Sequence, residues 1–177
     1  MASIITATVA SGLTQSADNS GVLQLASGTG NLVTVPSVTG TAMVSGNMPA
    51  FSAYNTSNQS VTDSTYTKVT LGTEEFDTNN NFASGRFTPT VAGYYQINGC
   101  VHTGTSSITR AIAYLYKNGS SYKRGNDLFV GGAVTVSAIV YLNGSTDYVE
   151  LYGYVTATTP LFYGTDTWFN GCLMRAA

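Results

Sequence analysis

Apolar and polar residues alternate with a period of two in the second half of the chain. In residues 134–142, one face of an extended chain would carry Val136, Ala138, Val140 and Leu142. The other face would carry Thr135, Ser137, Ile139 and Tyr141. The same spacing in residues 147–155 places Val149, Leu151 and Gly153 on the inward face. Because no apolar stripe keeps the helical period for long, the pattern predicts strands.

Asn-Gly pairs separate the predicted strands. Asn118-Gly119 follows residues 111–116, and Asn143-Gly144 follows residues 134–142. Such pairs favour tight turns between antiparallel strands, although the link through Asp147 predicts a looser connection than a minimal hairpin. About eight to ten strands fit between Phe51 and Met174, which is enough for two packed sheets. We therefore expect an all-β, two-sheet sandwich of antiparallel strands.

The first 47 residues differ from the rest. Asp18 is their only charged side chain, and the first Lys or Arg of the chain is Lys68. Three short apolar runs, at residues 4–9, 21–25 and 31–35, look like brief strands between Ser/Gly turns. Such a segment cannot alone offset roughly 1–2 kcal/mol of backbone entropy per residue, so it should order only against another surface.

We predict a β-rich docking arm over residues 1–47 and a head domain over residues 48–177. A flexible Ser/Thr/Gly leader is the alternative for the first segment. The apolar residues that would dock the arm are Ile4, Ile5, Val9, Val22, Leu23, Leu25, Leu32, Val33 and Val35.

Only 9% of the residues are charged, and the net charge is −2. A surface solvated mainly through Ser, Thr, Asn and Gly can be buried against neighbours without desolvating unpaired ions, each of which would cost several kcal/mol. Such a surface suits a permanent assembly. The seven Lys and Arg form no run, which argues against nucleic acid as a partner. No apolar stretch is long enough to span a membrane, and residues 1–10 make a poor signal peptide, so we expect no membrane partner.

Several segments of the head resemble the complement globular-head domain family, which shares its jelly roll with tumour necrosis factor. The resemblance begins with Phe82, Gly85-Arg86-Phe87-Thr88 and Ala92-Gly93-Tyr94-Tyr95-Gln96-Ile97. It continues in order with Leu115-Tyr116-Lys117-Asn118-Gly119, residues 136–142, Asp147-Tyr148-Val149-Glu150-Leu151 and Phe169-Asn170-Gly171-Cys172-Leu173. It covers about residues 50–175 and implies a jelly roll that forms threefold trimers, with one sheet of each subunit facing the axis.

Two departures from the family bear on function. Ala92 stands where the family often has Pro, and the collagen-like stalk of the secreted members is not present, which counts against a secreted complement-like role. Residues 11–35 instead resemble the leader segments of tailed-phage fibre and appendage proteins, where such segments precede a globular head.

In a packed strand, Gly171 would make room for a large neighbour from the other sheet.

The late strands would expose apolar side chains that a monomer would leave in water. The predicted trimer interface is Ile139, Tyr141, Trp168, Cys172 and Met174. Burying one such side chain contributes roughly 1.5–3 kcal/mol. A second outward stripe holds Tyr148, Tyr152 and Tyr154. It is either a partner-facing surface or ordinary cross-strand aromatic pairing, and we favour pairing slightly.

The residues give little support to catalysis or metal binding. His102 shares a strand face with Cys100, but their side chains would lie about 7 Å apart, and no Gly-x-Ser-x-Gly elbow accompanies them. Two Cys and one His lack the paired spacing of a zinc site, and we favour free thiols over a Cys100 to Cys172 bridge. The carboxylates at residues 74–77 lack a calcium-loop pattern and should lie in a solvated loop between strands. We expect no catalytic residue, no metal and no cofactor.

These features favour a structural protein of a virion, assembled in the cytoplasm of the host. The arm would bind the major capsid protein or another virion protein, and the trimeric head would decorate or cement a capsid or form a short fibre. The alternative is a receptor-binding head whose loops at residues 120–127 and 156–165 bind a host-surface glycan or protein.

Overall fold

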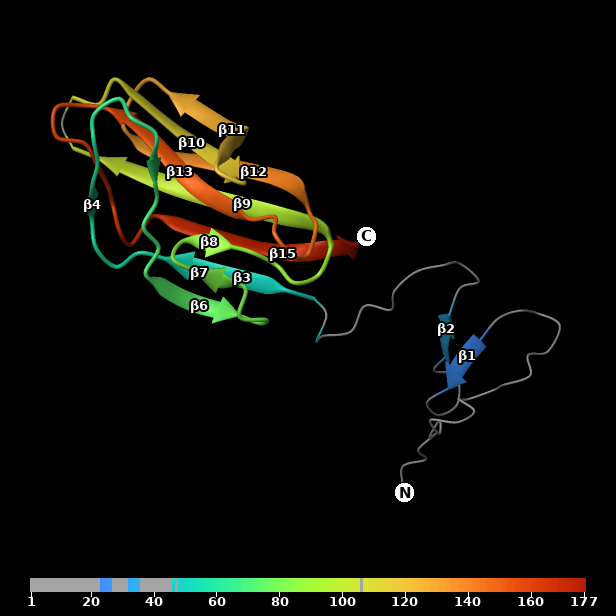
Figure 1. The fold of residues 1–177 in the computed structure, drawn as a ribbon. Coiled ribbons are helices and arrows are strands. Elements are labelled where there is room, and N and C mark those ends of the chain that lie inside the picture. The colour runs from blue at the N-terminus through green and yellow to red at the C-terminus, as the bar shows by residue number, and fades with distance from the viewer. Residues whose placement is uncertain (1–22, 27–31, 36–45, 47, 106) are drawn as a thin grey trace. The chain divides into compact units, whose positions relative to one another are not determined.

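The computed structural model describes residues 23–26, 32–35, 46, 48–105 and 107–177 (Figure 1). The chain divides into two compact units, Met1–Thr41 and Ala42–Ala177. In the first unit, β1 (Leu23–Ala26) pairs antiparallel with β2 (Leu32–Val35), with Leu23 opposite Val35. Two of the three predicted runs are therefore strands. The run at residues 4–9, with Ile4, Ile5 and Val9, lies outside the described residues, as does Val22, and the docking role of residues 1–47 stays a prediction.

The second unit is built from two antiparallel sheets (Figure 1). The seven-stranded sheet holds β3 (Ala50–Tyr54), β4 (Gln59–Ser60), β6 (Thr73–Asp77), β9 (Gly93–Gly104), β12 (Gly132–Leu142), β14 (Leu161–Phe162) and β15 (Trp168–Ala176). The six-stranded sheet holds β5 (Thr67–Lys68), β7 (Phe82–Ala83), β8 (Arg86–Phe87), β10 (Arg110–Lys117), β11 (Ser120–Leu128) and β13 (Val149–Thr156). The predicted two-sheet antiparallel sandwich is confirmed. Among the described residues, no helix has the length and apolarity needed to cross a membrane.

Strand β9 is the centre of the seven-stranded sheet. β12 pairs with it from Gly93 to Thr103, and β15 and then β14 occupy its other edge. β3 and β6 follow beyond β15. In the six-stranded sheet, β13 lies between β10 on one edge and β8 and β5 on the other.

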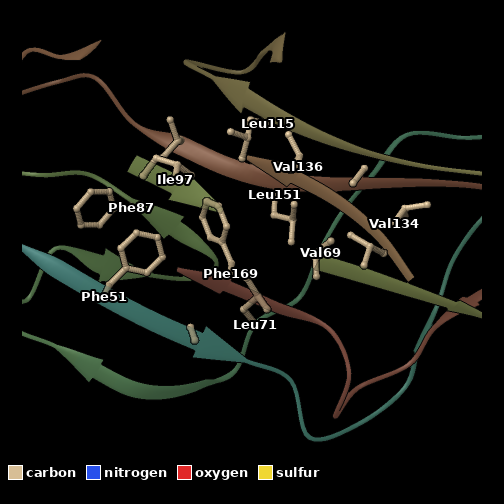
Figure 2. Packing of buried hydrophobic residues seen from close by; sticks show 14 of the residues in the cluster. Phe51, Val69, Leu71, Phe87, Ile97, Leu115, Val134, Val136, Leu151 and Phe169 are labelled. Atoms are coloured by element: carbon tan, nitrogen blue, oxygen red, sulfur yellow. The ribbon is translucent and has the colours of Figure 1, made fainter. Parts of the chain in front are cut away.

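The predicted alternation sets which side chains enter the core. Tyr95 and Ile97 of β9 are fully buried. The predicted inward residues of β12 and β13 are buried as well, except for Ala138, which is half-buried. An aromatic cluster then joins the two sheets (Figure 2). The ring of Phe51 stacks on Phe82 and Phe87 of the opposite sheet, with centroids 4.9 and 4.3 Å apart. Such pairs stabilise the fold by about 0.5–1.5 kcal/mol each beyond the area they bury.

Two glycines mark the closest approaches inside the core. A Cβ on Gly171 would lie 2.6 Å from Ile97 Cδ1 and 3.0 Å from Phe51 Cε1, so its large neighbours belong to adjacent strands of the same sheet. The prediction that they come from the other sheet is wrong. Gly99 has that role instead, because its Cβ would lie 2.5 Å from Leu151 Cδ1 across the sandwich.

The Asn-Gly turns form as predicted. Asn118 and Gly119 have φ of 53° and 78°, the left-handed values of a two-residue hairpin turn, and join β10 to β11. The connection from β12 to β13 is longer, and Asn143 Oδ1 accepts the backbone N–H groups of Ser145, Thr146 and Asp147.

Three sequence-based segment assignments need correction. Residues 120–127 form part of the edge strand β11 rather than a loop. Within residues 156–165, Leu161 and Phe162 form β14. The carboxylates Glu74, Glu75 and Asp77 lie in the edge strand β6, which pairs with β3. These segments are too short or too polar for the alternation of side chains to distinguish an edge strand from a loop.

Candidate functional site

The outward surface of β9, β12 and β15 carries all five predicted interface residues. Because Tyr95 and Ile97 point into the core, the alternate residues Tyr94, Gln96 and Asn98 point outward. We call this surface the β9 face, and it consists of Tyr94, Gln96, Asn98, Ser137, Ile139, Tyr141, Trp168, Asn170, Cys172 and Met174.

Apolar side chains gather at one end of the β9 face. Ile139 is 58% exposed and Met174 is 60% exposed. Tyr141 lies opposite Tyr94 in the β9–β12 register, and their ring centroids are 5.4 Å apart. Cys172 is exposed and lies on the same row as Ile139, since both pair with Gln96. Four of the five predicted interface residues therefore share this end, together with Tyr94, which the prediction omitted.

A band of uncharged polar side chains crosses the middle of the face. Asn98 Nδ2 donates to Asn170 Oδ1 at 3.1 Å, and Ser137 Oγ donates to Asn98 Oδ1 at 2.8 Å. Gln96 Nε2 donates to Asn98 Oδ1 at 3.0 Å and to Ser137 Oγ at 2.9 Å. The sequence analysis missed this band, although the alternation of polar and apolar residues from 94 to 102 was a signal for it.

Trp168 lies beyond the polar band, apart from the other predicted interface residues. It pairs with Cys100 and Tyr54, four residues along β15 from Cys172, or about 13 Å at the usual rise of a strand. Beside it is a hollow of about 360 Å³ lined by Ser52, Tyr54, Glu75, Thr165, Trp168 and Asn170. The interface role of all five predicted residues stays a prediction.

The two cysteines are free thiols in different environments. Cys100 is buried, although alternation places it on the outward side, whereas Cys172 is exposed. Burial raises the pKa of the Cys100 thiol, and the negative charge of Asp166 raises it further. His102 is engaged elsewhere, with Nδ1 2.9 Å from Asp166 Oδ2 and its ring 5.0 Å from Tyr163. Cys100 is therefore held as a protonated thiol, which is a poor nucleophile.

The second predicted stripe lies on the outer face of the six-stranded sheet and makes contacts within the subunit. Tyr152 stacks on Tyr116 with centroids 3.8 Å apart, and Tyr154 lies 4.9 Å from Tyr66. The contact between Tyr152 and Tyr116 is the predicted cross-strand aromatic pairing, whereas Tyr66 lies in the connection before β5. A partner for this stripe stays a prediction.

Glu150 is a functional candidate that the sequence analysis missed. Alternation along β13 places it outward, yet its side chain is only 3% exposed. Oε1 accepts Lys68 Nζ at 2.6 Å and Arg86 Nε at 2.9 Å. The Arg86 guanidinium also lies over the Tyr148 ring, 3.7 Å from its centroid. A buried carboxylate thus holds two partly exposed cations beside the tyrosines.

This architecture is similar to solved structures of the C1q and tumour necrosis factor type. The globular domain of the zebrafish complement 1qA protein matches with a TM-score of 0.55 and 22% identity, over 73% of this chain and 98% of its own. Murine APRIL matches with a TM-score of 0.56 and 10% identity, over 72% and 99%. The Eiger TNF from S. frugiperda matches with a TM-score of 0.56 and 8% identity, over 73% and 93%. No family model and no curated protein matches the chain.

The head is therefore a C1q/TNF-like jelly roll. The resemblance seen in the sequence is confirmed at the level of this fold.

Proposed function

We propose that this chain is a homotrimeric structural protein of a bacteriophage particle, anchored by residues 1–47, which decorates or cements the capsid or forms a short fibre. The observation that carries the proposal is the apolar end of the β9 face. Tyr94, Ile139, Tyr141 and Met174 are each more than 40% exposed on one small area of a single sheet. Exposed apolar residues grouped in this way mark an association surface.

The polar band supports the same assignment. Its members are amides and hydroxyls that already hydrogen-bond to one another, so a second copy can cover them without desolvating an ion. Hydrogen-bonding groups beside an apolar contact also fix the register in which copies meet. The β9 face can therefore be both stable and specific as an interface between copies of this chain.

The virion setting rests on the leading segment and the composition. Residues 1–47 carry one charged side chain, and residues 11–35 resemble phage leader segments. Both features suit a segment that is buried against the major capsid protein or another virion protein. Only 9% of the residues in the chain are charged, so a permanent assembly would desolvate few ions.

A receptor-binding head is the second candidate, and one observation favours it. Phe129 is 76% exposed and Val130 is 64% exposed, in the connection between β11 and β12. Apolar residues displayed on a connection are suited to contact with a host protein.

The mass of the full chain in solution tests the trimer. Sedimentation equilibrium should give three times the 18.5 kDa of one chain, and a stable monomer would overturn the proposal.

Antibody-gold labelling of purified particles tests the virion setting. Particles should be labelled, and deletion of residues 1–47 should remove the label while the shortened chain stays trimeric. If washed particles never carry the chain, the virion assignment is wrong. If the soluble head domain inhibits infection, the result supports the receptor-binding function.

A further inference from the structure

A polar hollow of about 560 Å³ lies at the β7–β8 hairpin, on the six-stranded sheet and away from the β9 face. Two cations, five neutral polar residues and one alanine line it: Lys68, Arg86, Asn80, Asn81, Ser84, Thr88, Thr90 and Ala83. Its volume is within the range of sites for small organic ligands, roughly 300–1,000 Å³. The proposed trimer makes no use of this hollow.

The charge in the wall favours an anion. Lys68 and Arg86 share the single buried carboxylate of Glu150, so the three groups together carry one net positive charge. The cation side chains are 32% and 44% exposed, whereas that of Glu150 is 3% exposed, so the positive groups lie nearer the solvent.

Arg86 is positioned to bind a carboxylate. Its Nε donates to Glu150, and the ring of Tyr148 supports its guanidinium plane. Its terminal nitrogens donate to no other residue in the described part of the chain. Two parallel N–H groups of a guanidinium match the two oxygens of a carboxylate.

Backbone geometry brings the two cations to the same wall. Ser84 and Gly85 form the turn between β7 and β8, with φ of 52° and 71°. A Cβ on Gly85 would lie 3.1 Å from the Val69 carbonyl oxygen and 3.3 Å from Lys68 Cε. The glycine therefore lets the hairpin approach Lys68. Asn80, also in the wall, has φ of 54°, a left-handed value that asparagine adopts readily in turns.

The neutral part of the wall matches hydroxyl groups. The side chains of Asn80, Ser84, Thr88 and Thr90 make no hydrogen bond to other described residues, so their donors and acceptors are available to a ligand. Asn81 holds this wall in place, because its carbonyl accepts Thr88 N–H at 2.8 Å.

A tyrosine platform adjoins the charged group. Glu150 of β13 pairs with Arg86 of β8 on one side and with Tyr116 of β10 on the other. Tyr152 lies two residues along β13 from Glu150, opposite Lys68, and stacks on Tyr116. Tyrosine offers a rigid apolar face with a polar edge at a low cost in conformational entropy.

We propose that this hollow binds an acidic saccharide, whose carboxylate is held by Arg86 and Lys68 and whose neighbouring ring lies on Tyr116 and Tyr152. A bare anion would use the cations but neither the neutral wall nor the tyrosines. A neutral sugar would leave the cation pair without a counterpart. The inference does not rest on trimerisation, because one subunit holds every residue involved.

Calorimetric titration of the full-length chain tests the site. The probes are trigalacturonate and 3′-sialyllactose, each compared with its methyl ester, which keeps the rings and removes the charge. At least one acid should bind at low millimolar concentration or tighter, and its ester should bind about tenfold more weakly or not at all. If neither acid binds, if esters bind as well as acids, or if inorganic phosphate binds as tightly as the acids, the proposal is overturned.

Three variants locate the binding. Arg86→Gln should weaken binding at least about tenfold. Ala83→Trp should abolish it by filling the hollow, since Ala83 lines the wall but takes no part in the ion group. Arg175→Gln removes an exposed cation from β15, in the other sheet, and should leave binding unchanged. Binding that survives Ala83→Trp, or that falls equally in Arg175→Gln, would refute the assigned location. Circular dichroism and the melting temperature confirm that each variant is folded.

Discussion

Replacing Ile139 with lysine should dissociate the proposed trimer. The side chain is 58% exposed in one subunit, so somewhat more than half of its surface is available to a neighbour. Full burial of an aliphatic side chain contributes roughly 1.5–3 kcal/mol, so this share contributes about 1–2 kcal/mol per copy and about 3–5 kcal/mol per trimer. A lysine in the same place would also have to lose its hydration or hold the copies apart.

These free energies predict a large change in assembly. Since each 1.4 kcal/mol is a factor of ten, loss of the isoleucine alone should raise the dissociation constant of the trimer by roughly a hundredfold to a few thousandfold. Sedimentation velocity over a dilution series measures this directly. At protein concentrations where the wild-type chain is trimeric, Ile139→Lys should sediment as a folded monomer.

Val130→Lys is the matched control. Val130 is 64% exposed, so the same substitution removes a similar exposed apolar surface, but from the connection between β11 and β12. This variant should remain trimeric. If Ile139→Lys is folded and sediments like the wild-type trimer, or if Val130→Lys alone dissociates, the β9 face is not the interface.

Three further predictions concern the stability of the head. Gly99→Ala should lower the free energy of unfolding by about 1–3 kcal/mol, because the new methyl would lie 2.5 Å from Leu151 Cδ1. In urea unfolding, the double variant with Leu151→Ala should lose less stability than the sum of the two single losses, and additive losses would contradict this contact. Tyr95→Phe should cost about 1–2 kcal/mol in the same assay, since the hydroxyl donates to a backbone carbonyl at 2.6 Å in the core; an unchanged midpoint would contradict this. The hydrogen bond from Asn118 lowers the pKa of Asp147, so this carboxylate stabilises the fold above its unfolded pKa and loses that effect as pH falls through the folded value. Asp147→Asn should therefore be less stable than the wild type at pH 6, with a gap that narrows below about pH 4; a gap that is constant with pH would refute the linkage.

The alternation of apolar and polar residues predicted most of the fold. It placed Tyr95, Ile97, Val136 and Leu151 in the core correctly, because in a half-buried antiparallel sheet the side chain's face is decided by parity alone. The Asn-Gly pair at 118 was equally readable, since few residues besides Asn and Gly adopt two successive left-handed conformations.

The alternation within one strand could not predict which side chains meet between strands that are distant in sequence. Glu150 faces outward by parity but is buried by Lys68 and Arg86, which are 82 and 64 residues away. The neighbours of Gly171 were assigned to the wrong sheet for the same reason. Register likewise decides the site: Trp168 and Cys172 share a face by parity, yet the Asn98 band lies between their rows.

The two outer faces of the sandwich divide the proposed functions between them. If the β9 face packs against sister copies, the six-stranded sheet, which lies on the opposite side of the core, is turned away from the threefold axis. Each trimer would then present three copies of the hollow beside Arg86 to its surroundings. A site that is weak in one subunit can hold a surface bearing repeated acidic saccharides, because linked sites raise the avidity by about 10²–10⁴ without any new contact. Trimerisation through the β9 face would then stabilise the assembly and also strengthen saccharide binding. The β9 face would affect the saccharide sites only by setting how the three copies are arranged.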